Sequence, residues 1–344
     1  MSTFTRVNTI TRDDYMPYVV DTILNSNVMV QRFFKKAEKW SGPQKRYPIK
    51  YQKNPNSGSF TGFDLLGTTS INTRVQAIFT PTFFHQDVAL PMTDIAINST
   101  KDQIIDLVKL ELASSTEDMV DSLGDIFYAD GTGNSSKDFL GLDALVDDGT
   151  ITPTIGGLSR TTYPTLVSPV VSPVGGLLSL KYMAQLWDAV TSGAQRPTIM
   201  STEEAVFSYY EQLRTPVEKY EIPSSVSADK ALIGNAGYTE LTYRGIAILK
   251  DEKTPSGRFY MLNEKYIHWV MLPFTELGSE PIEYSPVDIE GNDYDTALKG
   301  LGFSWSGWIK PVNQAALVGH IYLGGNFTTD NPKRSGKFLG ISGV

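Results

Sequence analysis

The 344-residue chain contains no cysteine and only three histidines. The absence of cysteine excludes disulfide bonds, thiolate nucleophiles and Cys-ligated metals. His85, His268 and His320 are far apart in the sequence, and no two of them have the spacing of a metal-binding pair. No apolar run reaches the length of a membrane span, and the first residues lack the basic-then-apolar layout of a secretory signal. We therefore expect no catalytic residue, no cofactor, no metal and no membrane partner.

Length and charge indicate several lobes and self-association. A chain of 344 residues exceeds the usual size of a single hydrophobic core, so at least two lobes are expected. The net charge of −8 is unevenly distributed: residues 1–60 hold ten Lys and Arg against four Asp and Glu, whereas residues 87–148 hold three against fourteen. The cations are not interleaved with aromatics as in a nucleic-acid platform, and the whole chain repels phosphate. The opposite charges instead favour oriented contacts between copies of this chain.

The strongest local pattern is a long amphipathic helix over residues 100–128, closed by a glycine-containing turn at 130–134. Apolar residues recur there at spacings of three, four or seven, which places them on one face of a helix. Apolar content continues after Gly124, so the helix is predicted to run past this glycine. Thr100 and Gln103 have the spacing of a capping box. The apolar stripe consists of Ile105, Val108, Leu112, Met119 and Leu123.

Residues 45–86 have the pattern of a β-hairpin with a long tip. Apolar and polar residues alternate over 47–51 and again over 71–79, and residues 53–59 are turn-forming. A two-stranded ribbon is marginally stable alone, so its apolar face must be covered by the same chain or by another copy. The candidate assembly contacts are the basic residues Lys45, Arg46, Lys50 and Lys53 and the apolar residues Ile71, Val75 and Phe79.

The middle of the chain predicts a second lobe of mixed helices and strands. Two amphipathic segments precede Gly193 and Pro216, and strand-like runs follow over 243–249, 259–262 and 267–272. Residues 303–323 return to strand character. The order of elements indicates an α+β fold.

Taken together, these residues resemble the major capsid protein of tailed bacteriophages with the Hong Kong 97-type fold. The likeness rests on the 100–128 helix, the turn at 130–134 followed by Gly141 and Leu142, the strand-to-helix step at 197–201, and the strand series from 243 to 267. The matching elements follow one another in the same order over nearly the whole chain, although no single motif is as specific as a nucleotide-binding loop.

The resemblance implies a division of the chain and an expectation about assembly. No residues are left for a fused scaffolding domain, so a scaffold is expected to be a separate protein. The implied parts are an N-terminal arm (1–44), an extended loop (45–86), a peripheral domain containing the spine helix (87–176), an axial domain (177–300) and C-terminal strands returning to the core (301–344).

The implied function is structural rather than enzymatic. Hexamers and pentamers of the chain would form an icosahedral shell around a double-stranded DNA genome, with DNA packaged without sequence-specific binding. Separate scaffold, portal and decoration proteins are possible partners. The expected location is the virion capsid, assembled in the host bacterial cytoplasm.

Three other functions stay open from the sequence. A cellular encapsulin-type nanocompartment would share the fold, and a tail tube or sheath protein would form rods. A carbohydrate-active hydrolase could use the acid pair Glu203 and Glu204 with the aromatic group around Trp305 and Trp308, but a helix-start charge and a strand core explain these residues better. Residues 288–299 imitate a calcium loop without its glycine and final acid, which favours a solvated turn.

Overall fold

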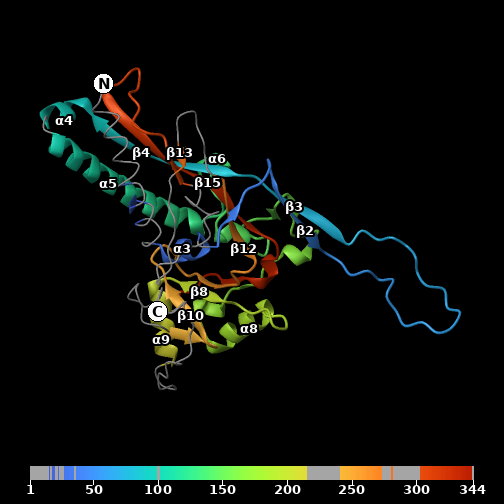
Figure 1. The fold of residues 1–344 in the computed structure, drawn as a ribbon. Helices are drawn as coiled ribbons and strands as arrows, with labels where there is room; N and C mark the ends of the chain where they lie inside the picture. The colour runs from blue at the N-terminus through green and yellow to red at the C-terminus, as the bar shows by residue number, and fades with distance from the viewer. Residues whose placement is uncertain are drawn as a thin grey trace, which may run out of the picture.

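The computed structural model describes residues 15, 18, 19 and 22 and the ranges 27–34, 36–98, 101–214, 241–272, 280–281 and 303–342. Two six-stranded sheets with helices packed against them form the body, and a thin ribbon projects from it (Figure 1). The expectation of an α+β architecture is confirmed. Within these ranges, no helix is long and apolar enough to cross a bilayer.

The first sheet is built around β15 (Ala316–Thr329), a strand of 14 residues. Its first part pairs antiparallel with β4 (Thr82–Pro91), and its last part pairs with β12 (Ile267–Met271). β15 can pair with both β4 and β12 because it is longer than either pairing. The sheet is completed by β1 (Glu38–Lys39) beside β12, and by β14 (Phe303–Trp305) and β13 (Glu280–Pro281) on the other side of β15.

The spine helix, α5 (Lys101–Tyr128), runs along β4 (Figure 1). The predicted stripe is buried at Val108, Leu112, Met119 and Leu123, so the helix covers the apolar face of the strand pair. The helix continues through Gly124, as its sequence predicts. The proposed cap at Thr100 lies outside the described residues.

The turn after α5 is fixed by side-chain and steric constraints. Asp130 Oδ1 accepts hydrogen bonds from the Thr132 backbone N–H at 2.9 Å and from its hydroxyl at 2.7 Å. Gly141 then packs against the helix end, where a Cβ would lie 2.3 Å from the carbonyl oxygen of Ala129. A side chain at this position cannot be accommodated, which explains the glycine physically.

The second sheet forms a separate lobe with its own core. Its order is β7 (Val170–Val171), β16 (Gly336–Phe338), β11 (Phe259–Leu262), β8 (Ile199–Thr202), β10 (Ile246–Lys250) and β9 (Leu241–Tyr243). The amphipathic helix α8 (Leu180–Val190) begins at Ser179, whose side chain accepts from the Tyr182 N–H, and buries Met183 and Leu186. The helix α9 (Glu204–Arg214) contributes Val206 and Tyr210 to the same core.

The division expected at 177–300 differs from the sheets in two places. Residues 267–271 belong to the first sheet, as β12, and the strands β7 and β16, from outside that range, belong to the second. Both assignments depend on pairing between segments far apart in sequence. An apolar strand such as Ile267–Met271 fits either core, so its composition does not identify its partner.

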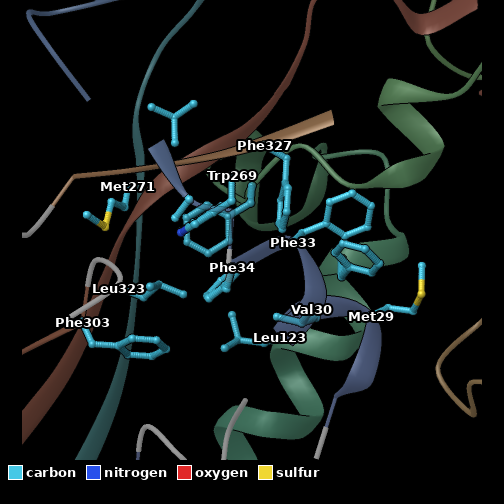
Figure 2. Packing of buried hydrophobic residues seen from close by; sticks show 14 of the residues in the cluster. Met29, Val30, Phe33, Phe34, Leu123, Trp269, Met271, Phe303, Leu323 and Phe327 are labelled. Carbon is cyan, nitrogen blue, oxygen red and sulfur yellow. The ribbon is translucent and has the colours of Figure 1, made fainter. Parts of the chain in front are cut away.

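The segment before the ribbon packs into the core of the first sheet. Helix α3 (Val28–Phe34) buries Phe33 and Phe34 beside Trp269 and Phe327 (Figure 2). The Phe34 ring stacks on the Trp269 indole with centroids 4.5 Å apart. Within the implied arm (1–44), the aromatic residues of α3 and the strand β1 thus pack on the first sheet of their own chain.

Buried ionic groups connect the two lobes. Asp143, from the short helix α7 (Leu142–Leu145), accepts hydrogen bonds from Arg258 at 2.6 Å and from the Lys337 ammonium at 3.0 Å. Lys337 also lies 3.3 Å from Asp147, and both side chains are fully buried.

The remaining described elements are α4 (Met92–Ile97), α6 (Gly133–Ser136), β5 (Thr154–Ile155), β6 (Leu158–Ser159) and the 3₁₀ helices η2 (Pro164–Leu166), η3 (Val174–Gly176) and η5 (Pro332–Arg334).

Candidate assembly surface

The extended loop consists of a ribbon and a long tip. Strands β2 (Lys45–Lys50) and β3 (Arg74–Phe79) pair antiparallel, from Lys45 opposite Phe79 to Lys50 opposite Arg74. Residues 51–73 connect them and project away from both sheets (Figure 1). The loop therefore lies where the sequence predicted a hairpin, although β3 begins at Arg74 and leaves Ile71 outside the strand.

The ribbon's inner face is covered by its own chain. Phe79 is only 2% exposed and Ile49 6%, and the half-buried Val75 packs against the same core. The Tyr47 hydroxyl lies 3.0 Å from Thr328 Oγ1, and burial raises the pKa of Tyr47 to about 12. Phe79, a candidate assembly contact, is therefore covered by its own chain, since an alternating pattern shows that one face is buried but not by which molecule.

A second attachment fixes the ribbon from the other edge. The Ile78 N–H donates to the Gly156 carbonyl at 2.9 Å. A Cβ on Gly156 would lie 2.8 Å from the Ala77 side chain, so this close approach requires glycine at φ 55°. These contacts attach the base of the ribbon to the body at Gly156.

The tip exposes large apolar side chains that the body does not cover. Phe63 and Leu65 are fully exposed, and Phe60 and Leu66 are more than half exposed. Exposed apolar residues grouped on one segment mark a contact surface for another molecule. Sequence reasoning missed them because turn residues dominate the tip; the signal was four large apolar residues within the seven positions 60–66.

The predicted basic residues have different environments. Lys45 Nζ forms an ion pair with Glu38 at 2.8 Å and lies 5.6 Å above the Tyr47 ring. Arg46, Lys50 and Lys53 are exposed. Lys45 therefore stabilises the ribbon base within its own chain, and the other three remain available for contacts.

The residues considered for catalysis have structural roles. Glu203 accepts the Gly257 N–H at 2.6 Å, and Glu204 pairs with Lys250 at 2.6 Å, which separates the acid pair. Trp305 is buried rather than presented to a ligand. The calcium-like segment 288–299 lies outside the described residues, and within those described no group of three His, Asp or Glu side chains could hold a metal ion.

Comparison with known proteins identifies the fold. No protein-family description matches the chain, and no curated protein sequence matches it. The cyanophage A-1(L) capsid structure has a TM-score of 0.67 at 14% identity, covering 92% of this chain and 93% of that chain.

Two further structures share the fold over similar lengths. The SrpI encapsulin of Synechococcus elongatus PCC 7942 has a TM-score of 0.55 at 10% identity, covering 92% of this chain and 90% of its own. The capsid of a native gene-transfer-agent (GTA) particle also has a TM-score of 0.55, at 8% identity, covering 92% of this chain and 90% of that chain. The two-lobed body with its spine helix and projecting loop is therefore the Hong Kong 97-type capsid fold.

Proposed function

We propose that this chain is the major capsid protein of a tailed phage and assembles into an icosahedral head around double-stranded DNA. The observation that carries the proposal is the exposed apolar tip, which projects from a body built around two cores. A monomer gains nothing from holding Phe63 and Leu65 in water, whereas a copy that covers them gains apolar burial. The protein's role is then structural, with hexamers and pentamers as its assembly units.

The test is assembly of the purified full-length chain, compared with a tip variant. Electron microscopy of the wild type should show spherical shells. The double substitution Phe63→Ser and Leu65→Ser should give folded subunits that elute as small species on a sizing column. Shells of normal yield from the variant, or rods from the wild type, would argue against the proposal.

A cellular nanocompartment is the second candidate, because the encapsulin structure has the same fold. The two functions differ in what the particle encloses. Particles purified from the native source should contain double-stranded DNA if the chain is a phage capsid. An enclosed enzyme without a genome would favour the nanocompartment.

A further inference from the structure

Two of the chain's three histidines lie next to each other on the first sheet. Strands β4 and β15 run side by side (Figure 1), with Asp87 opposite His320 and His85 opposite Tyr322. The imidazole rings of His85 and His320 are 6.1 Å apart, centroid to centroid, at an interplanar angle of 74°. Sequence spacing predicted no such pair, because only the pairing of two distant strands brings these rings together.

The histidine pair lies on the outer face of the sheet. Side chains alternate along both strands, so Val88 and Ile321 point into the core. On the opposite face His85 is exposed and His320 is half-buried. An ion can therefore reach the pair from solvent without any opening of the sheet.

His320 has a buried nitrogen that needs a partner. Within the described part of the chain, the Nδ1 atom of its ring makes no hydrogen bond, although its backbone N–H donates to the Ser306 hydroxyl at 2.8 Å. A buried polar atom without a partner is destabilising, and an ordered water or an ion is a physical explanation of such an atom. A ligand that bonds to Nδ1 would therefore bind favourably.

We propose that His85 and His320 together bind a divalent transition-metal ion such as Cu²⁺, Ni²⁺ or Zn²⁺. Neutral imidazole is a ligand that these ions share, and the chain has no thiolate to compete with it. The inference goes beyond the proposed shell-forming function and does not depend on it. The protein supplies two ligands, which leaves the other coordination positions for water.

The separation of the two rings suits an ion shared between them. An imidazole nitrogen lies about 2.0–2.1 Å from Zn²⁺, which puts each ring centroid about 3.2 Å from the ion. Two rings on one ion are then about 5.2 Å apart at the tetrahedral angle and about 6.4 Å apart when the ion lies on the line between them. The observed 6.1 Å falls in this interval, so side-chain rotation can complete the site without moving either strand.

Carboxylates near the pair favour a cation. Asp87 lies directly across from His320 on the same face, and Asp138 lines a small hollow together with His85. Lys137 lines the same hollow and opposes a cation there. Among the described side chains neither carboxylate forms a three-ligand group with the pair, so both act through their charge. Two acids against one base favour a metal cation over an anion such as phosphate.

Metal binding by histidine variants tests the site. Untagged full-length protein, freed of metal with a chelator, is titrated separately with Cu²⁺, Ni²⁺ and Zn²⁺ by isothermal titration calorimetry. The wild type should bind one ion per chain, with Cu²⁺ bound most tightly, as is usual for nitrogen ligands. His85→Gln and His320→Gln should each weaken binding at least about tenfold, because even changes in the outer-shell partners of metal ligands typically cost that much.

His268→Gln is the matched control. It removes the third imidazole, which lies 3.2 Å from Glu38 elsewhere on the first sheet, and leaves both proposed ligands in place. Its affinity for each ion should equal that of the wild type. Circular dichroism checks that every variant is folded. Because His85 is exposed, His85→Gln tests the site even if His320→Gln lowers stability.

Thermal unfolding gives a second readout. An ion that binds only the folded chain raises its melting temperature. Zn²⁺ should therefore raise the melting temperature of the wild type and of His268→Gln, but not that of His85→Gln or His320→Gln.

Three outcomes would overturn the inference. The wild type could show no saturable binding, His85→Gln could bind as tightly as the wild type, or binding could be lost only in His268→Gln, which would assign the ion to His268 and Glu38. Each outcome is compatible with normal shell formation, so the metal site can fail while the proposed function stands.

Discussion

Phe79 and Phe63 lie at the base and the tip of one loop, and their truncation should have opposite consequences. Phe79 is 2% exposed in the core, whereas Phe63 is fully exposed. Replacing a buried phenylalanine by alanine removes its transfer free energy and leaves a cavity, which costs about 3–5 kcal/mol of unfolding free energy. The T-shaped contact between the Phe79 and Tyr47 rings, 5.9 Å apart, is lost as well.

Phe63→Ala removes no contact within the chain. Its free energy of unfolding should therefore stay within about 0.5 kcal/mol of the wild type, while assembly should weaken because the tip loses part of its apolar contact. Denaturant unfolding, monitored on subunits kept below the assembly concentration, measures the first quantity. Light scattering at increasing protein concentration measures the second.

The unfolding free energies of these two variants can refute the assignment of either residue. If Phe79→Ala leaves stability unchanged, the ribbon base is not packed on its own chain. If Phe63→Ala lowers stability as strongly as Phe79→Ala, the tip is packed on the body and is not a contact surface.

Three further predictions concern the body. Gly141→Ala should destabilise the fold, because the new Cβ would meet the Ala129 carbonyl at 2.3 Å; an unchanged melting temperature would contradict this packing. Lys337→Met should cost about 3–5 kcal/mol in denaturant unfolding, because it leaves the buried Asp147 without its cation and removes one of the two cations that pair with Asp143; a neutral effect would contradict the ion network. Burial alone raises the pKa of Glu264, but the hydrogen bond and charge of Arg32, with Lys36, lower it overall below its ordinary 4.5. The stability that this carboxylate contributes is therefore present above pH 4.5 and lost as pH falls. Glu264→Gln should have a lower free energy of unfolding than wild type at pH 7, and the two values should converge in acid. A difference in unfolding free energy that is constant with pH would refute this assignment.

Local patterns predicted the elements that are determined by local physics. The spine helix ends at Tyr128, as predicted, because its apolar spacing persists through Gly124. The hairpin was also located correctly, since alternation and turn residues both specify a ribbon. Fold and loop position were therefore accessible from the sequence.

The sequence did not predict which surfaces cover each element. Phe79 was a candidate assembly contact, but it lies on the same ribbon face as Tyr47, which contacts Thr328 and His268 more than a hundred positions away. The placement of α3 in the core depends on Trp269 and Phe327, which a pattern within 28–34 does not contain. Long-range packing decides which molecule buries an apolar residue, whereas periodicity only shows that it is buried.

The most direct test of a shell-forming function is the mass of the assembled wild-type protein in solution. An icosahedral shell needs roughly 60 copies or more, which for a 38.0 kDa chain corresponds to at least about 2.3 MDa. Analytical ultracentrifugation at micromolar concentration and physiological salt should give a discrete species of that size or larger. A single species at 38 kDa under these conditions would contradict the account.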